Sequence, residues 1–339
     1  MPLEHPAMTN STATHRHLPN RLDNPFKSMV LSWESLLVLV AMAIFILNSF
    51  ASPYFLNAWS LSDMTFNFTE KALIALAMAL LIISGEIDLS VAAIIALAST
   101  LMGLALQYGA DTPVLVAIGI GTGIACGAFN GFLVTGLKLP SIVVTIGTMS
   151  LFRGISFIIL GDQSFKGYPA SFSWFGQGYV YWVISFELVL FIVCAVIYWV
   201  LLQRTNFGRR VYAIGNNDVA AQFSGVRVAR TKFILFCLTG LMSGVAAVLL
   251  TARLGSTRPS IAEGFELEAI TMVVLGGVSI LGGAGSILGV VLAALIMGLV
   301  TFGLGLLNVP GIVMSIFIGA LLIVVIALPI LFRMWRQRA

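Results

Sequence analysis

The sequence predicts an all-α polytopic membrane protein with about ten transmembrane helices. Of its 339 residues, 59% are hydrophobic and only 9% are charged, whereas soluble globular proteins have about 25% charged residues. The apolar residues occur in runs long enough to cross a bilayer, which takes roughly 20 residues in a helix. The basic residues gather between alternate runs. A soluble fold is excluded, because so few charges could not cover its surface.

Ten apolar segments follow one another along the chain. Residues 1–30 read as a disordered cytoplasmic tail, residues 31–330 as the transmembrane domain, and residues 331–339 as a basic cytoplasmic tail. The predicted spans are Leu31–Phe50, a second span ending in the run Ala72–Ile83, Val91–Leu106, Val114–Leu137, Ser141–Leu160, Val183–Leu202, Phe233–Leu250, Glu268–Leu281, Ser286–Leu306 and Val309–Leu328.

The loops between these spans have interfacial character. We expect Glu70 and Lys71 to lie near the outer end of the second span, where they can pair with each other or reach headgroups. Gly161–Tyr181 is rich in Gly, Ser and aromatic residues, and we expect it to be an outer loop.

The distribution of basic residues predicts the orientation. Thirteen of the 18 Lys and Arg lie in the two tails, at Lys138 or in the loop 203–232. Basic residues beside membrane spans stay on the cytoplasmic side. Both termini are therefore predicted to be cytoplasmic. The net charge of +4 follows these loops and is no sign of nucleic-acid binding.

The loop 203–232 is the longest polar interruption, and it contains a short helix signal. Asn217 and Asp218 are good N-cap residues, apolar residues follow at helical spacing, and a glycine stands where a left-handed residue would end the helix. The residues of this motif are Asn217, Asp218, Val219, Ala220, Phe223 and Gly225. Two interpretations stay open: an interfacial helix on anionic lipid headgroups, or a peg that a cytoplasmic partner grips.

The segment 84–90 does not read as a plain span. It places Glu86 and Asp88 between apolar runs, with no Lys or Arg within ten residues. Ionised groups at bilayer depth need a partner, a wet cavity or protonation. Asp88 and Ser90 could cap the helix that follows, or this junction of a broken helix could line a solute path.

The segment 276–289 is a second break, with glycines around Ser279 and Ser286. A phosphate-binding loop is excluded, because no Lys-Ser/Thr pair follows the glycines and no strand precedes them. A bend between two short helices fits better. The two breaks occupy comparable places in the halves 1–182 and 183–339, which predicts two pseudo-repeated halves, and such interrupted pairs indicate the binding path in transporters.

Further residues suggest packing or a path. Arg153 stands in an apolar run with Thr148, and it either pairs with a carboxylate or faces the pore. Pairs of glycines four residues apart allow close helix contact. These pairs are Gly127 with Gly131, Gly240 with Gly244, and Gly285 with Gly289.

No catalytic motif is present. The sequence has no Walker A motif, no metal-ligand cluster and no nucleophile motif, so we expect no enzyme, no cofactor and no metal. Cys126, Cys194 and Cys237 lie in apolar runs and read as small buried hydrophobes. If transport is ATP-driven, a separate chain must supply the ATPase.

Four stretches resemble the permease subunits of bacterial ABC importers for monosaccharides, of the ribose and xylose type. They are Gly85–Val91 (GEIDLSV), Pro140–Gly154 (PSIVVTIGTMSLFRG), Thr205–Gly225 (TNFGRRVYAIGNNDVAAQFSG) and Gly276–Gly289. The resemblance covers about residues 35–330, in the family's order. Glu86 and Ala92 stand where many members have glycine, and this variant is similar to rhamnose permeases.

The resemblance implies a transmembrane subunit in the bacterial inner membrane. It implies two ABC ATPase domains on the inner side, a second permease copy or paralogue, and a periplasmic sugar-binding protein. The helix at Asn217–Ser224 would be the coupling helix that docks on the ATPase. Translocation-path candidates are Glu86, Asp88, Ser90, Thr148, Arg153, Ser279 and Ser286.

Two other functions stay open. A proton-coupled secondary sugar transporter would use Glu86 or Asp88, because burial raises the pKa of a carboxyl group towards the working pH. A structural membrane protein would have no solute path at all.

Overall fold

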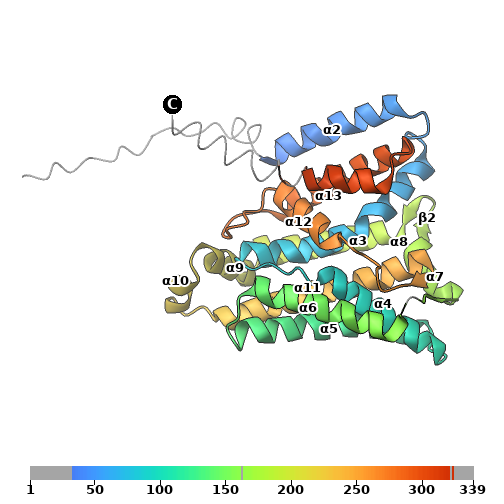
Figure 1. The fold of residues 1–339 in the computed structure, drawn as a ribbon. Helices are drawn as coiled ribbons and strands as arrows, with labels where there is room; N and C mark the ends of the chain where they lie inside the picture. Colours follow the sequence, from blue (N-terminus) through green and yellow to red (C-terminus); the bar gives the residue numbers. More distant parts are fainter. Residues whose placement is uncertain (1–32, 162, 321–322, 324–339) are drawn as a thin grey trace, which may run out of the picture.

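The computed structural model is a bundle of roughly parallel helices, which confirms the all-α prediction (Figure 1). It describes residues 33–161, 163–320 and 323. The tails predicted at 1–30 and 331–339 lie outside the described residues. The helices are α2 (Trp33–Ala51), α3 (Ala58–Ile83), α4 (Val91–Gln107), α5 (Thr112–Thr135), α6 (Ser141–Leu160), α7 (Ala170–Gln177), α8 (Phe186–Gln203), α9 (Asn206–Asn216), α10 (Asp218–Phe223), α11 (Val228–Leu254), α12 (Phe265–Leu275), α13 (Ile287–Leu306) and a last helix Gly311–Ala320.

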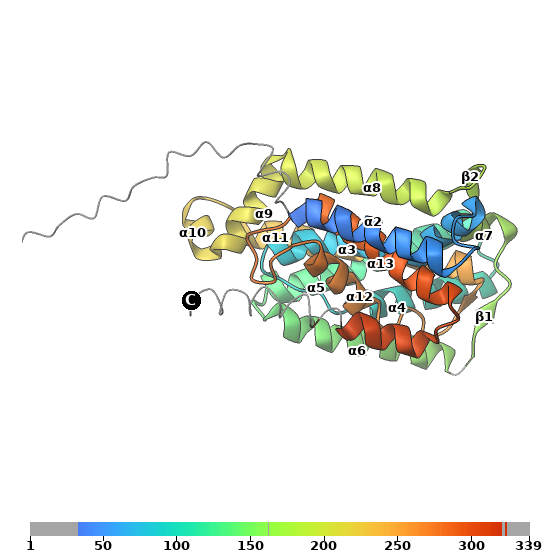
Figure 2. The same ribbon diagram turned by 90° about the horizontal axis from the view of Figure 1, so that it is seen from above.

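Most of the helices have the length and apolar composition of membrane spans. Within the described residues, seven are long and apolar enough to cross a bilayer, namely α2, α3, α5, α6, α8, α11 and α13. Helix α4 and the helix Gly311–Ala320 are apolar but shorter. Helices α9 and α10 project from one end of the bundle, and α7 and β2 lie at the other (Figures 1 and 2). The basic loop and the aromatic outer segment are therefore at opposite ends.

The expected outer loop Gly161–Tyr181 contains regular structure. Strand β1 (Phe165–Lys166) pairs with β4 (Ser256–Thr257), and β2 (Tyr179–Tyr181) pairs with β3 (Ile184–Ser185), both antiparallel. The β2–β3 hairpin delays the next span, which begins at Phe186 rather than Val183. Ser185 caps it by accepting a hydrogen bond from the Leu188 amide at 3.2 Å.

Helices α5 and α11 pack with their backbones in contact. A Cβ atom on Gly240 would come within 2.8 Å of the Gly127 Cα, and one on Gly123 within 2.7 Å of the Gly244 Cα. Such an approach is open only to glycine, so the contact expected of Gly127 and Gly240 is confirmed. Gly131 instead faces the aromatic side chains of Phe233 and Phe236.

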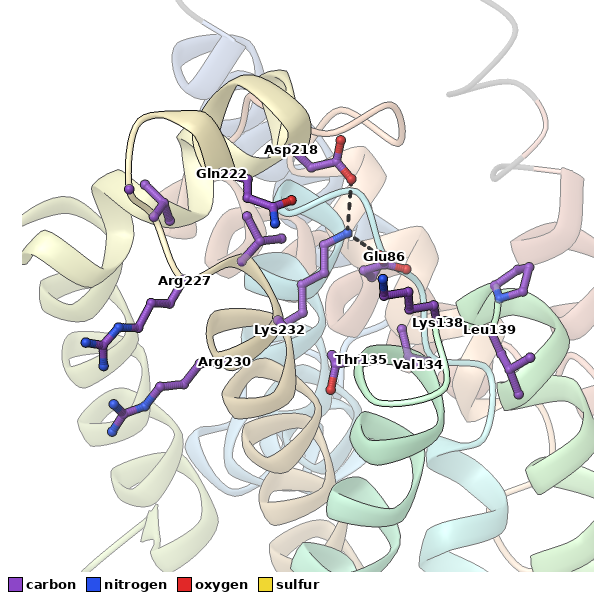
Figure 3. Close-up of a pocket in the computed structure, with 15 residues that line it drawn as sticks. Glu86, Val134, Thr135, Lys138, Leu139, Asp218, Gln222, Arg227, Arg230 and Lys232 are labelled. Atoms are coloured by element: carbon purple, nitrogen blue, oxygen red, sulfur yellow. Dashed lines mark hydrogen bonds and ion pairs between the residues drawn. The ribbon is translucent and has the colours of Figure 1, made fainter.

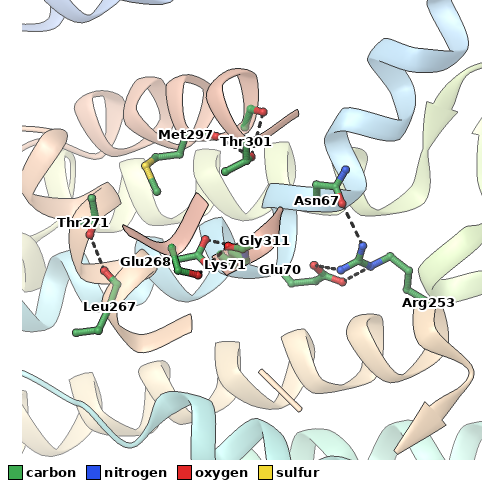
Figure 4. A network of polar contacts seen from close by, with 12 residues as sticks. Asn67, Glu70, Lys71, Arg253, Leu267, Glu268, Thr271, Met297, Thr301 and Gly311 are labelled. Carbon is green, nitrogen blue, oxygen red and sulfur yellow. Dashed lines mark hydrogen bonds and ion pairs between the residues drawn. The ribbon is translucent and has the colours of Figure 1, made fainter. Parts of the chain in front are cut away.

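The position expected for Glu70 and Lys71 was wrong. Helix α3 begins at Ala58 after the cap residue Asn57, so both residues lie inside the bundle rather than near its outer end. Glu70 is fully buried, and its carboxylate accepts two hydrogen bonds from Arg253 at 2.8 and 3.1 Å. Lys71 donates to Glu268 at 2.6 Å (Figure 4). These partners lie on α11 and α12, so the local sequence around α3 could not indicate them.

Candidate functional site

The loop 203–232 forms two helices where one was expected. The additional helix, α9, begins after Thr205, whose hydroxyl accepts hydrogen bonds from the Phe207 and Gly208 amides. Its buried face consists of Gly208, Val211 and Ile214. A capping threonine followed by apolar residues at helical spacing is a helix signal. The sequence therefore contained evidence for α9 that the single-helix interpretation missed.

Helix α10 is the short helix that the sequence predicts. The Asn217 side chain accepts a hydrogen bond from the Ala220 amide at 2.8 Å, and Gly225 follows the helix in the left-handed conformation with φ 83°. Val219 and Phe223 are 58% and 90% exposed. An isolated chain thus presents an apolar surface at the tip of this loop, beside the exposed residues Asp218 and Ala220.

The first break, 84–90, is tied to α10 through Lys232. The Lys232 Nζ lies 2.6 Å from Glu86 and 3.7 Å from Asp218. The side chains of Lys232 and Glu86 are only 15% and 13% exposed. The three residues line a cavity of about 810 Å³ together with Lys138 and Gln222 (Figure 3). The partner of Glu86 was missed because it lies 146 residues away in the chain.

Of the two alternatives for this segment, side-chain capping is not observed, because Ser90 stands at the N-cap position of α4 but its side chain makes no capping hydrogen bond. The Asp88 Oδ1 instead accepts hydrogen bonds from the amide and the hydroxyl of Ser90, at 2.8 and 2.6 Å. The Asn130 amide nitrogen donates to the Ser90 hydroxyl at 2.8 Å. All three residues are fully buried, and the Asp88 Oδ2 and Asn130 Oδ1 have no hydrogen-bond partner within the described residues. This cluster therefore keeps two buried acceptors open.

The second break comprises residues 276–286. The sequence predicts a short helix on each side of it, but only α12, the helix before the break, is short. Within it, the Ser279 amide donates to the Ala284 carbonyl at 2.9 Å. Ser286 caps α13 by accepting a hydrogen bond from the Gly289 amide at 3.1 Å, and its hydroxyl donates to Glu34 at 2.9 Å. Hydrogen bonds within the segment therefore form its turns and begin the helix that follows.

Helix α9 ends where the two breaks meet. The Gly283 amide donates to the Ile83 carbonyl at 2.9 Å, and the Tyr212 hydroxyl donates to the Gly285 carbonyl at 2.6 Å. A Cβ atom on Gly215 would overlap both the Ile83 oxygen and the Gly283 nitrogen. Partial burial raises the pKa of the Tyr212 phenol, which favours its protonated, donating form. We call the contact among Ile83, Tyr212, Gly215, Gly283 and Gly285 the junction.

Thr148 and Arg153 lie on α6 and are not part of the junction. Thr148 is buried, and its hydroxyl donates weakly to the Thr145 carbonyl at 3.4 Å. Arg153 donates to the Pro259 carbonyl at 2.8 Å and lies 3.5 Å from Glu263. Arg153 therefore holds the loop that precedes α12.

The described residues offer no metal site. No group of three or more His, Cys, Asp or Glu side chains that could hold a metal ion occurs within residues 33–161, 163–320 and 323.

Comparisons with known proteins place this arrangement in a family. Residues 60–326 match the family described as "Branched-chain amino acid transport system / permease component". The ribose import permease protein RbsC of Bacillus subtilis is 37% identical over 84% of this chain and 88% of its own length. The autoinducer 2 import system permease protein LsrD of Salmonella paratyphi B is 36% identical over 89% and 92%. No solved structure matches. The chain therefore belongs to this family and is a permease component of an ABC-type transport system.

Proposed function

We propose that the chain is the membrane-spanning subunit of an ATP-driven importer that moves a monosaccharide across the bacterial inner membrane. A separate ABC ATPase would dock on α10 at the cytoplasmic face, where Val219 and Phe223 present exposed apolar surface. A second permease copy or paralogue and a periplasmic sugar-binding protein would complete the assembly. Both chain termini would be cytoplasmic, in agreement with the positions of the basic residues.

The junction is the observation on which the coupling mechanism rests. Helix α9 is directly followed by α10, and its Gly215 contacts both Ile83, the residue just before the first break, and Gly283 in the second break. A rigid displacement of α9 and α10 by the ATPase would move both breaks together. The Asp218–Lys232–Glu86 contacts provide a second connection from α10 to the first break.

The translocation path would run beside the two breaks. A neutral sugar is recognised by hydrogen bonds and not by charge pairing. The acceptors Asp88 Oδ2 and Asn130 Oδ1, which lack a hydrogen-bond partner among the described residues, could accept hydrogen bonds from sugar hydroxyl groups once the segment moves. We keep Glu86, Ser90, Ser279, Ser286, Thr148 and Arg153 as further path candidates.

The relatives named for ribose and autoinducer 2 support import of a small polyhydroxylated solute. Within that class, the sequence GEIDLSVA at residues 85–92 leads us to propose a deoxyhexose such as rhamnose. Competition of unlabelled ribose and rhamnose against uptake of each labelled sugar would distinguish the two.

Reconstitution tests the assignment. Proteoliposomes containing this chain, its partner ABC ATPase and the matching binding protein should take up labelled monosaccharide only with ATP. Phe223→Asp should leave the chain folded, because the side chain is 90% exposed, and should abolish co-purification of the ATPase. Undiminished ATP-dependent uptake by this variant would contradict docking on α10.

Proton coupling is the alternative, and the buried Asp88 carboxylate, which forms no ion pair with another described residue, favours it. Uptake by the chain alone that a protonophore collapses would support it. In that case Asp88→Asn should abolish uptake while an ATPase makes no difference.

A further inference from the structure

Three arginines surround a second cavity at the same end of the bundle. This cavity of about 560 Å³ lies between α9 and the start of α11. Its cationic residues are Arg210, Arg227 and Arg230, and Phe207 and Ile234 supply its apolar wall. We call it the arginine pocket. It is distinct from the cavity of about 810 Å³ that Glu86, Asp218 and Lys232 line, although Arg227 and Arg230 also border that cavity.

The arginine pocket gathers positive charge without a visible counter-charge. Lys232 has two carboxylate partners, but none of the three arginines forms an ion pair with another described residue. Figure 3 shows the Arg227 and Arg230 guanidinium groups extending together, away from Lys232. Like charges held close together repel one another. A bound anion would remove that repulsion and stabilise the arrangement.

The position of the pocket favours a membrane anion. Ile234 lies in the second turn of α11, whose following residues form an apolar span. The nearby helix α8 places Trp199 beneath Arg204, with the guanidinium carbon 5.3 Å from the ring centroid. Tryptophan side chains mark the headgroup level of a bilayer. Trp199 would thus place this end of the bundle near the lipid phosphates, with Ile234 on the side of the acyl chains.

We propose that the arginine pocket binds the phosphate of an anionic phospholipid from the cytoplasmic leaflet. Planar guanidinium groups form paired hydrogen bonds with phosphate oxygens, and basic pockets between transmembrane helices are suited to anionic headgroups. The phosphate would lie between α9 and α11, with its acyl chains beside Ile234. The bound lipid would hold α9 and α11 at a fixed separation, and no ATPase is needed for this.

Native mass spectrometry of the purified chain in detergent tests the site. The chain is titrated with phosphatidylglycerol, with phosphatidylcholine and with inorganic phosphate. Phosphatidylglycerol should bind. The double substitution Arg227→Gln with Arg230→Gln should weaken its affinity roughly 25-fold, at about fivefold for each arginine. The charge-preserving pair Arg227→Lys with Arg230→Lys should retain much of the binding and provides a second variant if the glutamine pair does not fold.

The matched control removes two other arginines of the same loop. Arg204→Gln with Arg209→Gln changes the net charge equally, but these residues contact Trp199 and Asn206 and do not line the pocket. An equal loss in this control would overturn the site in favour of diffuse attraction. Equal binding of phosphatidylcholine, or displacement of the lipid by millimolar phosphate, would also overturn it. So would unchanged lipid binding together with lost ATPase capture, which would assign the arginines to the partner.

Discussion

The substitution Gly215→Ala tests whether the junction transmits motion. The added methyl group would overlap the Ile83 carbonyl oxygen and the Gly283 amide, and it would lie 3.0 Å from the Ile83 carbonyl carbon. Helix α9 must then retreat by more than an ångström from the point where the breaks meet. The hydrogen bonds Gly283–Ile83 and Tyr212–Gly285 would stretch or break.

The size of the effect follows from these contacts. Each lost hydrogen bond costs about 1 kcal/mol, and forcing a methyl group into a packed contact costs about 1–3 kcal/mol. The two bonds and the methyl group together cost roughly 3–5 kcal/mol, which corresponds to a shift of more than about 100-fold away from the intact junction. We expect ATP-dependent uptake to fall below about a tenth of the parent value, while ATPase co-purification persists because α10 is unchanged.

The assay compares uptake, ATPase binding and melting temperature in the same preparations. Gly121→Ala on α5 is the matched control, because a Cβ atom there would meet no other atom within 4 Å. A helical Gly→Ala change in open space should be neutral or slightly stabilising. Parent-level uptake by Gly215→Ala would refute the role of the junction.

Three further predictions concern pairs that the fold brings together. Lys232→Gln should destabilise the chain by about 1–3 kcal/mol, since it leaves Glu86 largely buried without its cation, and adding Glu86→Gln should recover most of this in thermal unfolding; Lys138→Gln, in the same cavity, should have little effect. Gly240→Leu should separate α5 from α11 and eliminate the monodisperse peak in size-exclusion chromatography, whereas an intact peak would show that the backbone contact is dispensable. Arg253→Met should cost about 3–5 kcal/mol by leaving Glu70 buried and unpaired, and full stability of this variant in tryptophan-fluorescence melting would argue against the pair.

The local structure of the loop 203–232 could be predicted directly from the sequence. Asn217 caps α10 and Gly225 follows it in the left-handed region as expected, because capping and glycine conformation depend on a few adjacent residues. The two breaks at 84–90 and 276–286 were likewise visible as polar or glycine-rich interruptions. The start of α3 was not, because its polar first turns resemble a loop until their partners are known.

Composition and periodicity alone determined that this chain is a multi-span helical membrane protein, since burial in lipid demands long apolar helices whatever their neighbours are. Only the tertiary structure decided that Glu86 pairs with Lys232 and that Glu70 pairs with Arg253. It also decided that Gly215 of α9 contacts the end of α3 beside the first break and Gly283 in the second break. The paired residues are 146 and 183 positions apart. Contacts over such separations depend on how the helices pack, which no local pattern of residues encodes.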